Sequence, residues 1–408
     1  MVKSHSKSHH GCRRCRQRKV KVLMRHFSMA QLGQLLMLVY SATRPFRVAS
    51  GALDVAASAM APLIRVPTWE PWTCTIEPAK SHLLDLDLVH SFVATTHSTL
   101  WSRSEGQLLW RDSIFREALQ QPFLMNGILA ISAMHRLFMG PRTPSPTATT
   151  LAKQGALLRG LLALLSSEND ESCLAAFPLA IIVSLWAFAS KNLPPEFNII
   201  SANTNPQSTQ TTHQGGFVST SYLDQFLDLI KLIQPVDAIV QKRLPRLLNG
   251  MYSELMRVPD PGQLPELSKD TSNALERLKS HLQQHEEELA NMVDSTSYAS
   301  LSNMFRLASC PEWSELIVGW AIQLPAPFVT RLRNRDHAAL VLLSYWAVCF
   351  SVLDGRWWAA GWSKALQSEI NCVVKDEWSH LLDWPNSCFE IQRWPSSPDI
   401  QSKTPPAG

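Results

Sequence analysis

Apolar residues recur at steps of three and four along most of the chain after residue 80, the spacing of one face of an α-helix. Alternating apolar and polar runs, which indicate half-buried strands, are nearly absent. The pattern therefore predicts an all-α body. The predicted helices are Asp85–Trp101, Gln107–Leu119, Pro122–Phe138, Thr149–Ser166, Glu171–Ser190, Tyr222–Ile233, Val236–Met256, Ser268–Met292 and Ala338–Leu353.

Two of these helices are apolar enough to predict a place at the centre of the body. Pro122–Phe138 is apolar almost all round, and its small residues, such as Gly127, would let neighbouring helices approach closely. Ala338–Leu353 is an almost unbroken apolar run that follows Asp336, a suitable N-cap. The run has 16 residues, too few to span a membrane, so we expect a core helix.

Interruptions of the periodicity predict the domain organisation. A polar stretch at 192–220, rich in Ser, Thr, Asn and Gln, is expected to be a disordered surface loop. Pro235 is expected to separate two helices, and Pro245 to bend the second. The expected parts are a basic motif with two cysteines at 1–22, a linker of unclear structure at 23–80, the helical body at 81–385 and a flexible tail at 386–408.

The charge of the chain is divided unevenly along its length. Residues 1–53 contain 11 Lys and Arg and no Asp or Glu, which leaves 27 of the 38 basic residues against all 34 acidic ones. A basic arm on an acidic body suggests that the arm contacts a polyanion. The eight cysteines show no disulfide-like spacing, and no signal peptide is evident, so we expect a reducing, intracellular location.

The arm contains the sequence Gly11-Cys-Arg-Arg-Cys-Arg-Gln-Arg-Lys-Val-Lys21. Two cysteines spaced Cys-x2-Cys can provide two of the four ligands of a zinc site, and the cations between them suit a phosphate backbone. The candidate metal ligands are Cys12 and Cys15, and the candidate DNA-contacting residues are Arg13, Arg14, Arg16, Gln17, Arg18, Lys19 and Lys21.

This arm resembles the fungal binuclear zinc cluster, in which six cysteines share two zinc ions and present basic residues to DNA. The resemblance implies zinc as cofactor, promoter DNA as partner and the nucleus as location. Val22 stands where that family has its third cysteine, and no further cysteine occurs before Cys74. We therefore expect no stoichiometric zinc in this chain. A misjoined coding sequence and natural decay of the module both remain open as explanations.

The last third of the chain carries a second resemblance. Leu353-Asp354, Trp357-Trp358, Gly361-Trp362 and Trp384-Pro385 occur in the order found in the regulatory domain of sterol-uptake-control-type fungal transcription factors. That resemblance implies an all-helical domain that takes a sterol or another apolar ligand in its C-terminal half, and a homodimer is also conceivable. The candidate pocket residues are Trp346, Trp357, Trp358 and Trp362, although aromatic residues at helical spacing also serve as plain core.

Motifs typical of enzymes are absent from the sequence, including phosphate-binding glycine loops and the Gly-x-Ser-x-Gly elbow, so we expect no enzymatic activity. His281 and His285 share one helix face but lie in polar surroundings, which favours a solvated face. The leading hypothesis is a fungal transcription factor, with a metabolic or secondary-metabolite gene cluster as its expected target. The alternative is a regulatory-domain protein without specific DNA binding that acts through a ligand or protein partners.

Overall fold

The computed structural model describes residues 78–140, 144–165, 170–191, 193, 197, 221–285 and 297–390. Every regular element in these ranges is a helix, and they contain no strand, so the all-α prediction is confirmed for this part of the chain. The basic arm, with all of its candidate zinc and DNA ligands, lies outside the described residues.

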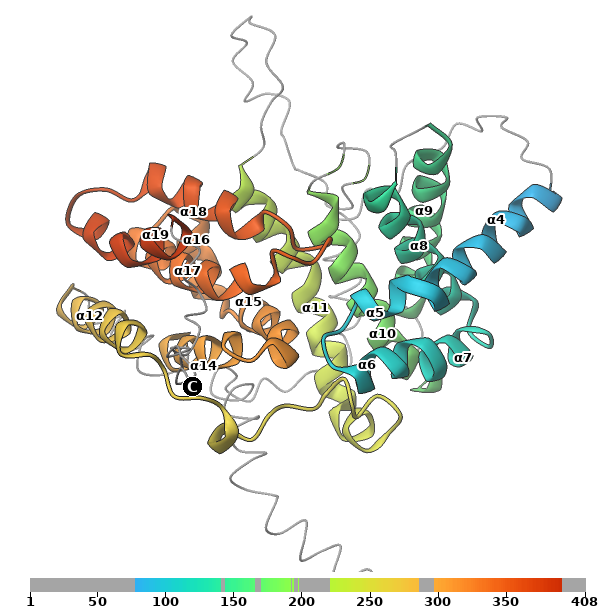
Figure 1. Ribbon diagram of the computed structural model, residues 1–408, viewed down its shortest axis with the longest axis horizontal. Helices are drawn as coiled ribbons and strands as arrows, with labels where there is room; N and C mark the ends of the chain where they lie inside the picture. The colour runs from blue at the N-terminus through green and yellow to red at the C-terminus, as the bar shows by residue number, and fades with distance from the viewer. Residues whose placement is uncertain are drawn as a thin grey trace, which may run out of the picture.

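The first group of helices forms one side of the body (Figure 1). Its elements are α4 (Pro78–Ser91), the π-helical η1 (Phe92–Thr96), α5 (His97–Thr99), α6 (Ser104–Leu108), the π-helical η2 (Leu109–Ile114), α7 (Phe115–Ala118), α8 (Pro122–Met139), α9 (Pro144–Leu165) and α10 (Asp170–Ser190). As predicted, α8 is central and packs against both α9 and α10. A Cβ at Gly127 would lie 2.6 Å from Leu179 Cδ1 of α10, so a larger residue here would force the Leu179 side chain to shift.

A single long helix, α11 (Tyr222–Asn249), lies between the two sides of the body (Figure 1). The prediction of two helices separated by Pro235 is therefore wrong, because α11 continues through that position and through Pro245. Loss of one backbone hydrogen bond at a proline costs about 3 kcal/mol. We attribute the continuity to the apolar face of α11, whose buried residues include Leu223, Phe226, Leu227, Leu229, Ile230, Leu232, Ile233, Leu244 and Leu247.

The second group of helices forms the other side of the body (Figure 1). Its elements are the 3₁₀ turn η4 (Pro261–Gln263), α12 (Lys269–His285), α14 (Ser297–Ala308), the 3₁₀ segment η5 (Pro311–Ile317), α15 (Val318–Ile322), α16 (Ala326–Arg333), α17 (His337–Phe350), η6 (Ser351–Leu353), α18 (Trp362–Val373), η7 (Asp376–Leu382) and α19 (Asp383–Glu390).

The central element of this group is α17, whose residues from Ala338 to Phe350 are all buried. Asp336 caps it as predicted, because its carboxylate Oδ1 accepts a hydrogen bond of 3.0 Å from the Ala339 amide. Helix α19 runs through Pro385, where the sequence suggested that the body ends, and stops at Glu390.

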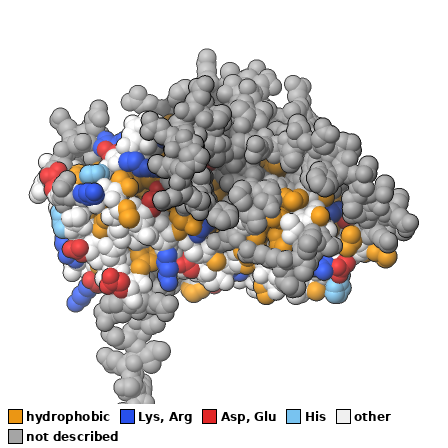
Figure 2. Space-filling model, turned by 90° about the horizontal axis from the view of Figure 1, so that it is seen from above, with side chains coloured by type: hydrophobic (Ala, Val, Ile, Leu, Met, Phe, Trp, Pro, Cys, Tyr) orange, Lys and Arg blue, Asp and Glu red, His pale blue; other side chains and the backbone are white. Residues whose placement is uncertain are grey.

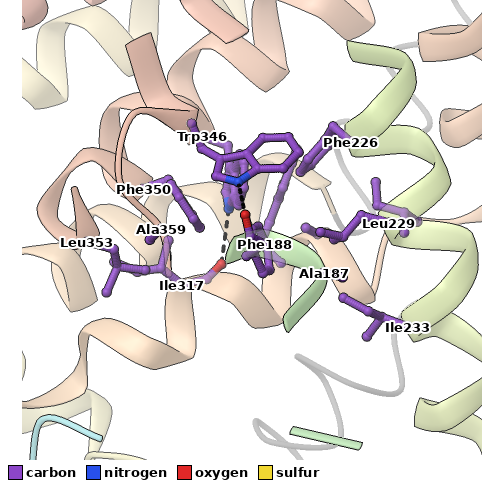
Figure 3. Close-up of a cluster of buried hydrophobic side chains, with 14 of the residues drawn as sticks. Ala187, Phe188, Phe226, Leu229, Ile233, Ile317, Trp346, Phe350, Leu353 and Ala359 are labelled. Carbon is purple, nitrogen blue, oxygen red and sulfur yellow. Dashed lines mark hydrogen bonds between the residues drawn. The ribbon is translucent and has the colours of Figure 1, made fainter. Parts of the chain in front are cut away.

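One continuous apolar core joins the two sides through α11. Figure 3 shows Trp346 of α17 among Phe350, Phe226 and Phe188, which come from α17, α11 and α10.

The stretch 192–220 was predicted to be a surface loop, but Leu193 and Phe197 near its start are buried. The Phe197 carbonyl accepts hydrogen bonds from the Trp186 indole and the Gln154 amide. These contacts extend the core beyond α10. The other residues at 192–220 lie outside the described ranges, whereas Lys191, directly before this stretch, is described.

Among the described residues, no single helix is both long and apolar enough to cross a membrane. By length and composition alone, α16 and the stretch from His337 to Leu353 meet the criterion together, but they are bent by 103° relative to each other.

Candidate functional site

The connection between α17 and α18 brings together the residues that carry the regulatory-domain resemblance. We call Asp354, Arg356, Trp357, Trp358 and Trp362 the tryptophan junction. Its turn depends on residue 361, which has a left-handed backbone (φ 76°) that favours glycine. The Asp354 carboxylate closes the turn by accepting a hydrogen bond from the Ser363 hydroxyl. This short turn thus joins Trp357 and Trp358 to Trp362 at the start of α18.

The candidate pocket residues lie in or against the core. Trp346, Trp358 and Trp362 are at most 2% exposed, while Trp357 is half-buried. Every indole N–H of the four has an acceptor within the protein. The donations are Trp346 to the Ile317 carbonyl (3.0 Å), Trp357 to the Thr99 hydroxyl (2.9 Å), Trp358 to the Thr99 carbonyl (3.4 Å) and Trp362 to the Phe188 carbonyl (2.8 Å). These indoles therefore tie α17 and the junction to η5, α5 and α10.

Arg356 forms the centre of a polar cluster beside the indoles. Its guanidinium donates to the Thr99 carbonyl (3.3 Å) and the Ser102 hydroxyl (2.6 Å), and lies 3.4 Å from the Glu315 carboxylate. Ser102 also donates to Glu315 at 2.5 Å and lies 3.0 Å from the Ser314 hydroxyl. The cluster joins the end of the first helical group to η5 and the junction.

Burial dominates the electrostatics of this cluster. The Glu315 side chain is only 7% exposed, and burial raises the pKa of its carboxyl group, while the hydrogen bond from Ser102 and the charge of Arg356 oppose that rise. The Ser102 hydroxyl contacts a carboxylate, a second hydroxyl and a guanidinium, and none of these hydrogen-bond partners among the described residues is a histidine. This arrangement suits a clamp between elements better than an activated nucleophile.

His135 of α8 also contacts Trp357. Its ring stacks on the Trp357 indole at a centroid distance of 5.0 Å, and its Nδ1 lies 3.0 Å from the Thr96 hydroxyl. Burial lowers the pKa of His135, which favours the neutral ring at neutral pH. The histidine therefore acts here as an aromatic and hydrogen-bonding contact between α8 and the junction.

A second group of polar side chains, Lys191 and Asp354, lies beside Trp362, and its hydrogen bonding is less complete than that of the Arg356 cluster. The Lys191 ammonium lies 4.9 Å from the centroid of the Tyr222 ring and 5.2 Å from that of Trp362. Asp354 lies nearby, and its carboxylate Oδ1 is buried with no hydrogen-bond partner. Within the Arg356 cluster, by contrast, no buried side-chain atom of Ser102, Ser314, Glu315 or Arg356 is left without a partner.

The sequence identified the tryptophans of this site but not their polar partners. Ser102 and Glu315 are 213 positions apart, and neither lies in a recognisable motif. A histidine on the apolar Pro122–Phe138 helix was the one available signal for His135. His281, expected on a solvated face, instead has its ring 4.7 Å from that of Trp378 and 5.1 Å from that of His380, so the expectation of polar surroundings is corrected by packing against η7.

No group of three or more His, Cys, Asp or Glu side chains that could hold a metal occurs in the described part of the chain. No protein-family profile, curated protein or solved structure matches the chain. Its charge distribution, its arm motif and the geometry of the junction are therefore what bear on function.

Proposed function

We propose that this chain is a fungal transcription regulator of the zinc-cluster class, acting in the nucleus on metabolic or secondary-metabolite genes. The basic arm contacts DNA, and the helical body is the regulatory domain. The observation that carries the proposal is the charge split, with 11 cations and no acidic residue in positions 1–53. Cations in such a density attract the phosphate backbone whether or not they read bases.

The body offers a contrast to the arm, because many of its cations are paired within the fold. On the face that Figure 2 shows, basic and acidic side chains of the described residues are interspersed and form no single basic patch. The pairs include Arg103 with Glu254, Arg136 with Asp87, Lys153 with Asp85, Arg335 with Asp224 and Arg356 with Glu315. These pairs support the arm, rather than the described body, as the contact with DNA.

The arm is expected to provide nearly all affinity for DNA. We expect a chain that starts at His82 to bind duplex DNA at least about 100-fold more weakly than the full chain at low salt. For the full chain, the logarithm of the binding constant should fall linearly with the logarithm of salt concentration, by about 0.9 per phosphate neutralised. Fluorescence anisotropy with a labelled duplex at several salt concentrations measures both quantities.

A matched full-length variant separates charge from chain length. Replacing Arg13, Arg14, Arg16, Arg18, Lys19 and Lys21 by Gln should flatten the salt dependence while leaving the body intact, which circular dichroism checks. Equal DNA affinity of the His82 chain and the full chain would rule out the arm as the contact.

Zinc is expected to be absent in stoichiometric amount. Cys12 and Cys15 supply two thiolates, whereas a structural zinc site uses four ligands, and Val22 occupies the position of the third family cysteine. Elemental analysis of the dialysed full chain should therefore find well under one zinc per chain. A content of about two zinc ions per chain would contradict this prediction and restore a complete cluster.

The same valine favours the second candidate function, a regulatory-domain protein that acts through a ligand or protein partners. Without metal to hold the arm, phosphate attraction survives while base readout is lost. Sequencing the transcript across codons 15–80 distinguishes the candidates. Restored cysteines would support sequence-specific regulation, whereas an uninterrupted match to the present sequence would favour the second function.

A further inference from the structure

Lys191, at the C-terminal end of α10, occupies an unusual position for a lysine. Its side chain is half-buried, and its amine lies over the rings of Tyr222 and Trp362 at 4.9 and 5.2 Å from their centroids. It forms no hydrogen bond and no ion pair within 4.0 Å with any described residue. Other lysines of the described body behave differently, since Lys153 pairs with Asp85 and Lys231 with Asp228.

Asp354 of the tryptophan junction is close enough for its charge to act on the Lys191 amine. Its Oδ2 accepts from the Ser363 hydroxyl, whereas its buried Oδ1 has no hydrogen-bond partner. Lys191 lies against Gly361, because a Cβ at this residue would lie 3.4 Å from Lys191 Nζ, and the Gly361 backbone also acts to lower the pKa of Asp354. Gly361 is exposed, so small molecules can reach this side of the amine. The Lys191 amine thus lies near a carboxyl group whose charge acts on it, and no ion pair joins the two.

The surroundings increase the neutral fraction of the amine above that of an ordinary lysine. Burial lowers the pKa of Lys191 to about 8, although the charge of Asp354 opposes the change. Burial also raises the pKa of Asp354, against the effect of the Ser363 hydrogen bond, the Gly361 amide, Lys191 and Lys364. Relative to the ordinary lysine value of 10.5, the neutral fraction at pH 7 is roughly 300-fold larger.

We propose that Lys191 is a reactive amine that binds aldehydes covalently as an imine. The Nζ lone pair attacks the carbonyl carbon, forming a C–N bond, and a proton passes from nitrogen to oxygen to give a carbinolamine. Loss of the hydroxyl group as water takes up one proton from solvent, and the nitrogen returns its remaining proton to solvent, which leaves the C=N bond. The overall change is amine plus aldehyde to imine plus water, so no oxidant or reductant is required. The neighbouring rings suit an aldehyde with an aromatic or apolar body, and the inference does not depend on the proposed function.

The full chain can be tested directly with pyridoxal 5′-phosphate, a soluble aromatic aldehyde, followed by borohydride reduction and peptide mass spectrometry. The reference is Lys364, an exposed lysine on α18. We expect Lys191 to be modified at least about 10-fold faster than Lys364 at pH 7.5, which allows for the lower nucleophilicity of a less basic amine. The rate at Lys191 should rise with a midpoint near pH 8. Modification of Lys191 at the rate of Lys364, or more slowly, would overturn the proposal.

Two further measurements show whether the folded site causes the reactivity. In urea, the rate advantage of Lys191 should disappear, and its persistence would overturn the structural explanation. In Asp354→Asn, which keeps an acceptor for Ser363, loss of the negative charge should move the pH midpoint of Lys191 labelling downward. A midpoint that stays in place or moves upward would show that Asp354 does not face the amine. If the variant fails to fold, the ratio of Lys191 to Lys364 labelling in the unaltered chain still decides the proposal.

Discussion

Replacing Trp358 by Ala is expected to lower the free energy of unfolding by roughly 3–5 kcal/mol. The side chain is 1% exposed, its ring lies 6.1 Å from that of Phe188, and its indole donates to the Thr99 carbonyl. The truncation would leave a large cavity at the place where α10 and α5 meet the junction. Urea denaturation of the full chain, followed by tryptophan fluorescence and circular dichroism, measures the loss.

The same variant separates a core residue from a pocket residue when the binding of a fluorescent sterol is measured beside stability. A large loss of stability makes Trp358 structural, whereas preserved stability with lost sterol binding makes it a ligand contact. If neither quantity changes, the side chain faces solvent and its assignment to the core is wrong.

Trp358→Phe keeps an aromatic ring and loses the hydrogen bond, so it should cost about 1 kcal/mol beyond the effect of its smaller volume. Met139→Ala, at a side chain that is 74% exposed, is the surface control and should change stability by less than about 0.5 kcal/mol.

The positions of the main helices could be predicted because their signals are local. The apolar spacing that predicted Pro122–Phe138 and Glu171–Ser190 corresponds to α8 and α10 within a residue at each end. Asp336 could be recognised as a cap because the capping bond reaches only three residues along the chain. Elements of this kind depend on residues that are close in sequence.

Other predictions failed where tertiary packing outweighs local preference. Pro235 disfavours a helix interior by itself, but the apolar residues on both sides of it are buried together when α11 stays continuous. Phe197 is one of a few apolar residues in a mostly polar stretch, and its side chain is buried while its carbonyl accepts hydrogen bonds from the Trp186 and Gln154 side chains. Hydrophobicity averaged over that stretch could not reveal that one of its residues is buried.

The candidate site was predictable only in part. The tryptophans after α17 were visible as a motif, whereas their partners are Thr99, Ser102 and Glu315, which are separated from the junction by up to 259 positions along the chain. A polar residue that acts through a distant partner leaves no local pattern. The fold of α5 and η5 against the junction is what brings these groups together.

Replacing Arg356 by Met is expected to cost roughly 2–4 kcal/mol of stability at neutral pH. Removing one partner of a buried ion pair leaves the other charge without compensation, which costs about 3–5 kcal/mol in a fully buried site. Here the Glu315 side chain is 7% exposed and that of Arg356 is 26% exposed, so the expected value is somewhat lower. The hydrogen bonds of the guanidinium to Thr99 and Ser102 are lost as well. Urea denaturation at pH 7.5 measures the cost.

The pH dependence of this cost follows from Glu315. The pKa of its carboxyl group in the folded chain is raised above the ordinary 4.5, chiefly by burial. Because the folded chain binds this proton more tightly than the unfolded chain, protonation of Glu315 stabilises the fold. This contribution is complete below pH 4.5 and is lost as pH rises through the folded pKa. Without Arg356, which lowers that pKa, the folded value rises further. The difference in stability between Arg356→Met and the unaltered chain should therefore shrink as pH falls from 7.5 toward 4.5.

A double-mutant cycle with Glu315→Gln tests whether the uncompensated carboxylate is the cause. Gln keeps an acceptor for Ser102 and carries no charge, so Arg356→Met should cost much less in its presence, with a coupling energy of about 1–3 kcal/mol. The matched control is Arg111→Met, because Arg111 pairs with Asp112 at the surface, where the side chains are 41% and 51% exposed. That change should cost far less than Arg356→Met and show no comparable recovery on acidification. An Arg356→Met deficit that is independent of both pH and Glu315 would mean that the guanidinium stabilises the junction through packing and its hydrogen bonds alone.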